Sequence, residues 1–342
     1  MTRTLTQRDL NRALLERQFL LTRKRATLPK ALERLGGLQA QYAPSMYIGL
    51  WSRVDGFGRR QLTKALERKT VVQATLLRST IHLVSARDYW PFAVGIRDAR
   101  RRWYLRVHPR RAESELIAAA EDVRRRLADG PVRRAELVEP LGTELWNGVG
   151  VWLNLVRVPP SGTWEQRRAD LFAAAEDWLG AAEVEREEGL ERLVRSYLGG
   201  FGPAAATDIA SWAGMAVGEI TPVIERMPLR RFGDERGGEL LDLPRAPLPD
   251  GDTPAPVRFL PTWDATLLVH ARRTAILPEP YRPLVFSTKR PHSVGTFLVD
   301  GAVAGSWRYE KGRVRIEPFR RLTRTDRNEV EEEADLLGAF HA

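Results

Sequence analysis

The chain contains no cysteine and only five histidines among its 342 residues. Without cysteine it can form no disulfide, no thiolate nucleophile and no thiolate metal site. The histidines are scattered along the chain and never fall at a metal-ligand spacing such as H-x-x-x-H. We therefore expect no zinc site, no other metal and no cofactor.

Long apolar runs are also missing. No segment approaches the ~20 uninterrupted apolar residues that a membrane-spanning helix needs, and the N-terminal MTRTLTQRDLNRAL is charged and periodic. We therefore expect a soluble, cytoplasmic protein without membrane contacts that acts as a monomer.

Positive charge, by contrast, is abundant. Lys and Arg number 54 against 44 Asp and Glu, which gives a net charge of +10. Most of the cations are arginines, whose planar guanidinium suits phosphate better than an ammonium group does. This balance predicts a polyanionic partner. The alternative is a GC-rich genome that uses arginine for surface solubility.

Apolar residues recur at helical spacing in the first 70 residues, over 5–21, 31–38 and 62–68, with Thr6 as a candidate N-cap. VVQATLLRSTIHLVS follows and is typical of two strands around Leu77 to Ser79. Helices followed by a β-wing are the order of a winged helix, a fold that often binds DNA.

The same order returns twice. Helical patterns begin at SELIAAAEDVRRRLADG and again at GLERLVRSYLGGFGP, where the glycine pair predicts a helix end. Asp300 and Gly301 between apolar runs predict a tight hairpin. We expect an α+β, predominantly α fold of three tandem winged-helix units, over 1–110, 111–188 and 189–342, the last with a β-rich extension and a C-terminal helix.

Stronger catalytic machinery is not evident. The sequence has no G-x-S-x-G motif and no P-loop. Asp264, in LPTWDATLLVHARR, is the best candidate for a buried carboxylate, near His270 or Arg272. It is either part of a site or a structural ion-pair partner, since ion-pair networks often resemble sites.

Three blocks carry a family resemblance: GLQAQYAPSMYIGLWSRVDGF, TLLRSTIHLVSARDYW and FLPTWDATLLVHARR. They resemble the AlkZ/YcaQ family of winged-helix DNA glycosylases over essentially the whole chain. The resemblance implies three winged helices in a C-shape with a basic concave face. It also implies hydrolysis of the N-glycosidic bond of N7-alkylated purines, including natural-product adducts and interstrand crosslinks. The substrate would be double-stranded DNA that carries such lesions.

The catalytic motif of that family is a glutamine, an apolar residue and then glutamine or aspartate. Gln39, Ala40 and Gln41 match the glutamine form, which places the chain nearer the self-resistance branch. An N7-alkylpurine is already cationic, so it leaves without protonation by a general acid. The remaining task is to hold a water and aim negative dipoles at the oxocarbenium ion, which two amide oxygens can do.

Further residues are candidates for lining the site or for binding DNA. Tyr42, Tyr47, His82 and Asp264 are candidates to line the site, although the tyrosines also suit core packing. The resemblance implies that the hairpin at Asp300 enters a groove of the duplex. The candidate DNA-binding residues are Arg59, Arg60, Lys64, Arg78, Lys289, Arg290 and His292. A non-catalytic winged-helix transcriptional regulator is the alternative function.

Overall fold

The computed structural model describes residues 3–267, 274–287 and 292–342. The first unit consists of α1 (Gln7–Arg17), α2 (Leu28–Leu35), β2 (Leu38–Gln39), α3 (Ala43–Trp51), α4 (Arg59–Glu67), β3 (Val71–Thr75), the 3₁₀ turn η1 (Leu77–Ser79), β4 (Ile81–Ser85) and α5 (Ala86–Val107). Thr6 caps α1 in a capping box with Asp9, as the sequence predicts. β3 and β4 pair antiparallel across η1, so the predicted wing is confirmed.

Gln39 lies on a strand rather than at the end of a helix. α2 ends at Leu35 because Gly36 adopts a left-handed φ of 76°, which glycine takes without steric cost. The chain then pairs with β4, and Gln39 lies opposite His82. β2 is consequently an edge strand that presents Gln39 beside the wing.

The second unit shares its sheet with the first. Its elements are α6 (Glu113–Arg126), β5 (Val132–Arg133), α7 (Arg134–Val138), α8 (Thr143–Trp152), β6 (Leu155–Arg157), β7 (Leu171–Ala174) and α9 (Ala175–Leu179). β6 pairs with β3, which joins the two wings in one sheet of order β2-β4-β3-β6-β7-β5. The wings of the two units therefore form one continuous platform.

The third unit packs across the first. It contains α10 (Arg186–Phe201), α11 (Ala206–Ala213), α12 (Val217–Arg226), β8 (Arg230–Asp234) and β9 (Glu239–Asp242), and β1 (Thr4–Leu5) pairs with β8. The glycine pair does not end the helix as predicted but lies inside α10. A Cβ at Gly200 would lie 2.7 Å from the carbonyl oxygen of Leu35, so glycine is needed where α10 crosses α2.

The C-terminal extension is a second sheet covered by a helix. Its elements are β10 (Arg258–Leu260), η2 (Glu279–Tyr281), α13 (Arg282–Val285), β11 (Phe286–Ser287), β12 (His292–Ser293), β13 (Gly295–Val299), β14 (Ala302–Glu310), β15 (Arg313–Pro318) and α14 (Arg324–His341). The tight turn at Asp300 and Gly301 joins β13 to β14, as predicted. Arg8 and Arg12 of α1 both bind the Asp300 carboxylate. That turn is thus held against α1, and its expected entry into a DNA groove stays a prediction.

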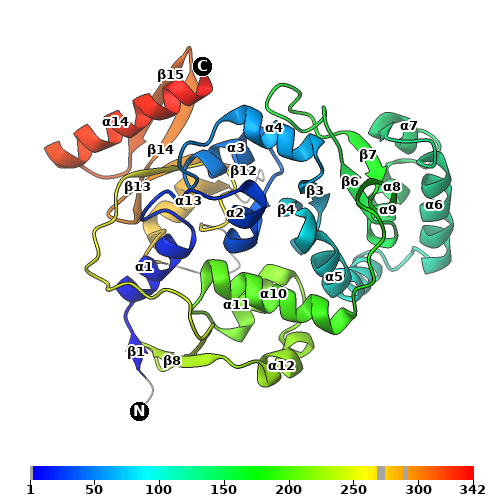
Figure 1. Cartoon of the computed structure of the whole chain (residues 1–342), viewed down its shortest axis with the longest axis horizontal. Coiled ribbons are helices and arrows are strands. Elements are labelled where there is room, and N and C mark those ends of the chain that lie inside the picture. The colour runs from blue at the N-terminus through cyan, green and yellow to red at the C-terminus, as the bar shows by residue number, and fades with distance from the viewer. Residues whose placement is uncertain (1–2, 268–273, 288–291) are drawn as a thin grey trace.

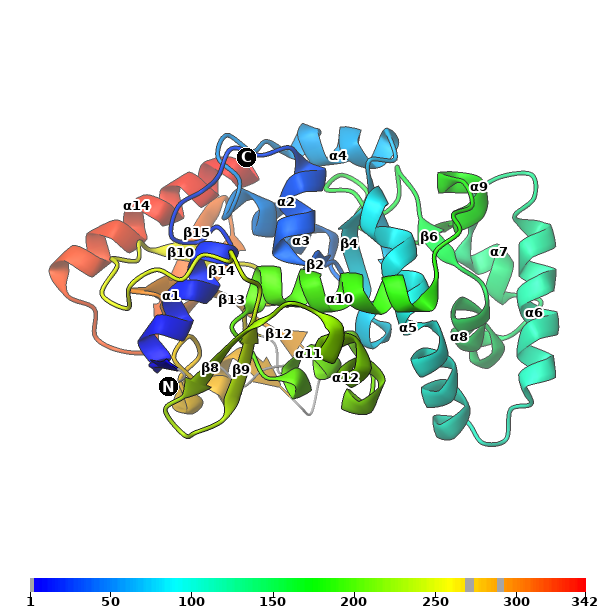
Figure 2. The ribbon, with the colours of Figure 1, turned by 60° about the horizontal axis from the view of Figure 1, so that its bottom comes forward.

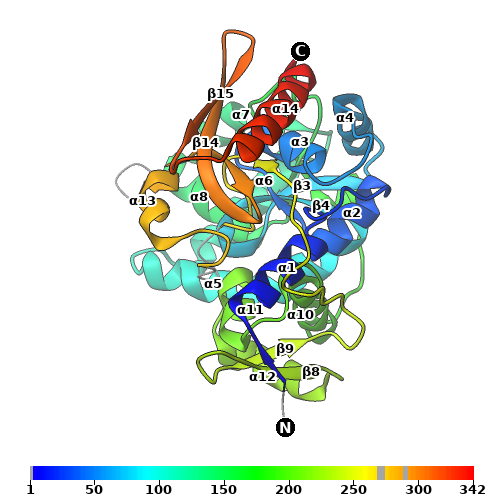
Figure 3. The ribbon, with the colours of Figure 1, turned by 90° about the vertical axis from the view of Figure 1, so that its left-hand side faces the viewer.

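The units form an elongated arrangement. Figure 1 shows α6 to α9 at one end, α14 with β14 and β15 at the other, and the first and third units between them. α10 runs beside α2 and α5 (Figure 2), and α14 lies along the sheet that contains β15 (Figure 3). Within the described residues, none of the helices combines the length and the apolar character needed to cross a bilayer.

Candidate active site

The two glutamines of the motif lie together at the edge of the first wing. Gln39 is buried, with 7% of its surface exposed, whereas Gln41 is exposed just beyond the end of β2. The Gln39 Nε2 donates to the Gln41 Oε1. The structure therefore brings the pair into direct contact, with one amide anchored in the fold and the other at the surface.

Arg78 reaches Gln39 from a strained turn. Two consecutive residues of η1 have left-handed backbones, Arg78 at φ 51° and Ser79 at φ 57°. Such conformations cost about 1–3 kcal/mol outside glycine and gather at functional sites. The Arg78 Nη1 donates to the carbonyl oxygen of Trp212 at 2.6 Å. α11 thereby holds the guanidinium beside the glutamine pair.

The direction of these hydrogen bonds fixes the orientation of both amides. A guanidinium can only donate, so the 3.5 Å contact from Arg78 Nη2, at the outer limit of hydrogen bonding, identifies its partner as the carbonyl oxygen of Gln39. The Gln39 amide nitrogen then faces the Gln41 oxygen. Each carbonyl oxygen keeps a second lone pair, which can accept a hydrogen bond from a water molecule.

The charge of Arg78 has no acidic counterpart within the described residues. Its guanidinium forms no ion pair with a described carboxylate, and burial lowers its pKa to about 10, so it stays protonated near neutral pH. A partly buried, unpaired cation is costly unless an anion approaches it. The DNA-binding role expected of Arg78 would supply such an anion, and it stays a prediction.

His82 lies opposite Gln39 on β4 and is buried. Burial, followed by the nearby charge of Arg78, lowers the pKa of its imidazole to about 3. A carbonyl oxygen can only accept, so the 3.0 Å contact with the Thr80 carbonyl places the proton of the neutral ring on Nδ1. His82 is therefore a neutral imidazole that is tied to the wing backbone.

This histidine predicts a stability that depends on pH. In the unfolded chain His82 titrates near 6.5, so between that pH and about 3 the unfolded state holds one proton more than the folded state. The free energy of unfolding should then decrease as pH falls below about 6.5, by up to ~1.4 kcal/mol per pH unit. Urea unfolding of the parent and of His82→Asn, whose amide can replace the Nδ1 donor, measures this slope between pH 5 and 7.5. The variant should show a shallower slope, and equal slopes would contradict the assignment.

The predicted cations of α4 lie in different surroundings. The Arg59 guanidinium stacks over Trp164, 5.0 Å from the ring centroid, and its Nη1 donates to the carbonyl oxygen of His341. Arg59 therefore helps to fix the C-terminal helix, and its expected contact with DNA stays a prediction. Arg60 and Lys64 are exposed and line a cavity together with Glu67 and Glu165, apart from the glutamine pair.

The two candidate tyrosines differ in burial. Tyr47 is fully buried, its hydroxyl lies 3.0 Å from the Thr63 hydroxyl, and its ring packs edge-on against Trp164. It belongs to the core and does not line the site. Tyr42 is 45% exposed and accepts a hydrogen bond from Arg167, so it remains at the surface next to Gln41.

Asp264 is a structural ion-pair partner. Its Oδ1 accepts from Arg53 Nη2 at 2.8 Å and from both the backbone and the hydroxyl of Thr266. Both members of the ion pair are buried, with side chains no more than 1% exposed. Of the two interpretations of Asp264, the structure supports the structural one and places it among the fold-stabilising residues.

The last group of predicted DNA contacts is only partly visible. Lys289 and Arg290 lie outside the described residues, and only the backbone of His292 is described, in β12. β11 and β12 form a short antiparallel hairpin that flanks residues 288–291. The DNA contacts expected of Lys289, Arg290 and His292 therefore stay predictions.

Two neighbours of the site were missed by the sequence prediction. The carbonyl oxygen of Trp212 holds Arg78, and Gly214 lies against the Arg78 backbone, where a Cβ would come within 3.1 Å of its nitrogen. Both lie more than 130 positions further along the chain. No local pattern connects them to the wing, so only a three-dimensional structure could find them.

The chain was compared with family models, curated proteins and solved structures. A family model described as DNA glycosylase AlkZ-like matches residues 32–340. The chain belongs to this family. The predicted family and enzyme class are confirmed. The chain is a DNA glycosylase, and the alternative of a non-catalytic regulator is not supported.

A solved structure shows the same AlkZ-like fold. Streptomyces sahachiroi DNA glycosylase AlkZ is similar with a TM-score of 0.83 and 19% sequence identity, over 99% of this chain and 97% of that chain. The predicted α+β class with tandem winged-helix units is thereby confirmed. Among curated proteins, none matches the chain.

Proposed function

We propose that this AlkZ-like glycosylase hydrolyses the N-glycosidic bond of N7-alkylated purines, with Gln39 and Gln41 as the catalytic pair. The observation that carries the proposal is a contacting pair of neutral amides beside an arginine with no carboxylate partner among the described residues. Neutral amides are poor acids and bases. They suffice when the leaving base is already cationic and needs no proton.

The pair is suited to a positively charged sugar. As the glycosidic bond breaks, charge develops on the deoxyribose, and carbonyl dipoles aimed at it stabilise that state. The free lone pairs of the two oxygens also hold a water close to the anomeric carbon. The positive charge of Arg78 would oppose an oxocarbenium ion, so we propose that a phosphate next to the lesion neutralises it.

The exposed end of the pair supports bulky substrates. Gln41 and Tyr42 are both exposed and the buried Gln39 contacts Gln41, so the pair begins at the surface and not at the end of a deep pocket. A crosslinked base is tethered to both strands and cannot be rotated into a closed pocket as most excised bases are. We propose that natural-product adducts and interstrand crosslinks are accepted for this reason, in repair or in self-resistance to a genotoxin.

The direct test uses duplex DNA that contains N7-methylguanine, and a second duplex with a bifunctional N7 crosslink. We expect abasic sites that break only after hot alkali, because no lysine lies in the catalytic block to cleave the strand through a Schiff base. Excess breaks over buffer support the proposal. Tight binding without any such breaks would refute the proposed substrate class.

Binding should depend steeply on salt. Neutralising even two phosphates gives a slope of about −1.8 in log K against log salt, which is a ~12-fold loss of affinity between 50 and 200 mM. Fluorescence anisotropy with a labelled duplex measures this slope. An affinity that stays constant over this range would contradict a binding surface built on arginine.

A further inference from the structure

Besides Arg78, two further arginines without a carboxylate partner among the described residues lie on the other side of η1. Arg100 of α5 and Arg157 of β6 line a cavity of about 270 Å³ between the first wing and the second unit. Arg100 Nη2 donates to the carbonyl oxygen of Gly150 at 3.0 Å, and Arg157 Nη1 donates to the Thr75 hydroxyl at 3.0 Å. The Nε atoms of both are buried without a hydrogen-bond partner. Neither arginine forms an ion pair with a described carboxylate.

The surroundings of this cavity suit an anion. Its lining contains no Asp or Glu, and Ser79, Thr75 and Asn147 add polar groups to the two guanidiniums. Burial lowers the pKa of Arg100 and of Arg157 to about 10, so both remain charged near neutral pH. Two desolvated cations in the lining of one cavity are costly, and an anion bound in that cavity would offset part of this cost.

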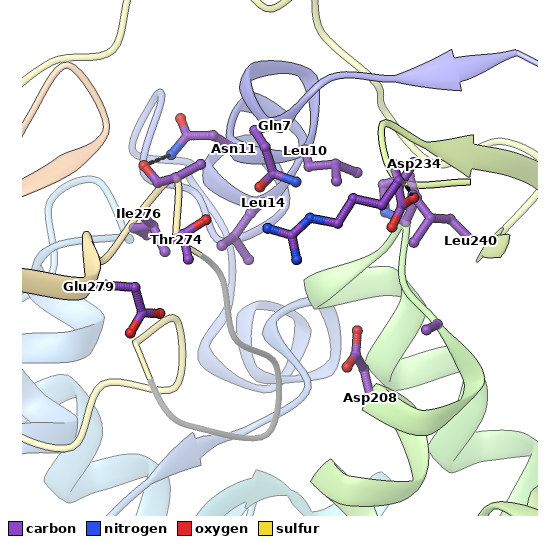
Figure 4. Close-up of a pocket in the computed structure, with 14 residues that line it drawn as sticks. Gln7, Leu10, Asn11, Leu14, Asp208, Asp234, Leu240, Thr274, Ile276 and Glu279 are labelled. Atoms are coloured by element: carbon purple, nitrogen blue, oxygen red, sulfur yellow. Dashed lines mark hydrogen bonds between the residues drawn. The ribbon is translucent and has the colours of Figure 1, made fainter. Parts of the chain in front are cut away.

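The cavity near α1 differs in this respect. It measures about 620 Å³ and is lined by the carboxylates of Asp208, Asp234 and Glu279 (Figure 4). Arg236 lines it as well, so this cavity has charges of both signs. Of the two cavities, only the one at Arg100 and Arg157 has a lining without Asp or Glu.

One strained turn connects this cavity to the glutamine pair. Arg78 of η1 contacts Gln39, while its neighbour Ser79 lines the cavity. Both residues have left-handed backbones. The turn thus presents Arg78 to the glutamine pair and Ser79 to the cavity. A strand of DNA that places its lesion at Gln39 would pass η1 and reach the cavity with its backbone.

We propose that Arg100 and Arg157 bind a phosphodiester group of the DNA strand, on the far side of η1 from Gln39. The site acts in affinity and not in bond breaking, since neither arginine contacts the glutamine pair. The proposal rests on the glycosylase acting on DNA and does not depend on which base is removed. Its failure would appear in binding constants, whereas failure of the proposed chemistry would appear in the rate at saturating DNA.

Gly150 offers a test that leaves both arginines in place. A Cβ at this position of α8 would meet no atom within 4 Å, so a side chain fits there without displacing its neighbours. Gly150→Asp brings a carboxylate to the cavity, and Gly150→Asn is its isosteric neutral control. We expect Gly150→Asp to bind duplex DNA ~10-fold more weakly than Gly150→Asn, with a salt slope shallower by about 1. The single-turnover rate at saturating DNA should be the same for both.

A second experiment identifies the phosphate. Duplexes in which one phosphate at a time is replaced by a neutral methylphosphonate are bound to the parent and to Arg157→Gln. One position should weaken binding by the parent and leave binding by Arg157→Gln unaffected. Arg231→Gln, which removes an exposed arginine paired with Glu239, is the charge-matched control and should behave as the parent does.

Three outcomes would overturn the proposal. Equal affinities of Gly150→Asp and Gly150→Asn for duplex DNA would show that no DNA phosphate enters the cavity. A methylphosphonate profile that is identical for the parent and Arg157→Gln would exclude contact with a DNA phosphate. Tight binding of inorganic phosphate in a thermal-shift titration, combined with unchanged DNA affinity of Gly150→Asp, would assign the cavity to a free anion instead.

Discussion

Replacing Gln39 by alanine is expected to lower the single-turnover excision rate by roughly 10- to 1000-fold while the Kd for duplex DNA stays nearly constant. The amide oxygen is proposed to stabilise charge that exists only in the transition state. Its loss should therefore leave the binding of DNA in the ground state unchanged. Gln41→Ala should have an effect in the same direction. The assay is alkali cleavage of N7-methylguanine DNA with enzyme in excess.

Gln7→Ala is the matched control for this substitution, because Gln7 is exposed at the start of α1, away from the pair. It should retain both the parent rate and the parent affinity. A proportional loss of binding and rate in Gln39→Ala would mean that Gln39 only supports the wing.

Replacing Asp264 by alanine should lower the free energy of unfolding by about 3–5 kcal/mol, since it leaves the buried Arg53 guanidinium without its counter-charge. Asp264→Asn keeps an oxygen that can accept from Arg53 and Thr266, so a smaller loss is expected. The double variant Arg53→Met with Asp264→Leu should recover most of the stability, because apolar residues of similar volume replace a buried ion pair at little cost.

Urea unfolding of the four proteins measures these differences. Excision by Asp264→Ala should fall only as far as the folded fraction falls. If this variant is as stable as the parent and nevertheless inactive, Asp264 takes part in the chemistry and the structural assignment is wrong.

Local patterns in the sequence predicted the parts of the fold that local interactions determine. The β-branched run of residues 71–85 forms the wing, and Asp300 with Gly301 forms a hairpin turn. The end of α10 was predicted wrongly, because Gly200 serves the contact with Leu35 and not a helix stop. A glycine needed for close packing has the same local appearance as one that ends a helix.

The same distinction between local and distant contacts applies to the candidate site. Gln39, Gln41, Arg78 and His82 lie within 45 residues of one another, on or next to the paired strands β2 and β4, and the structure brings them together. The partners that decide the roles of other residues are distant in the chain. Arg53 pairs with Asp264, and Arg59 packs on Trp164 and the C-terminal helix. Such contacts leave no periodic signal, so the packing of Arg59 on Trp164 could not be predicted from the sequence.

The central claim is that two neutral amides and a bound water suffice because the lesion already carries a positive charge. The most direct measurement compares single-turnover excision of N7-methylguanine with that of O6-methylguanine, which carries the same methyl group on a neutral base, in otherwise identical duplexes. We predict excision of the cationic base at least ~1000-fold faster, since a neutral purine needs a proton that neither amide supplies. Comparable rates on the two bases would contradict the account and require a general acid elsewhere in the protein.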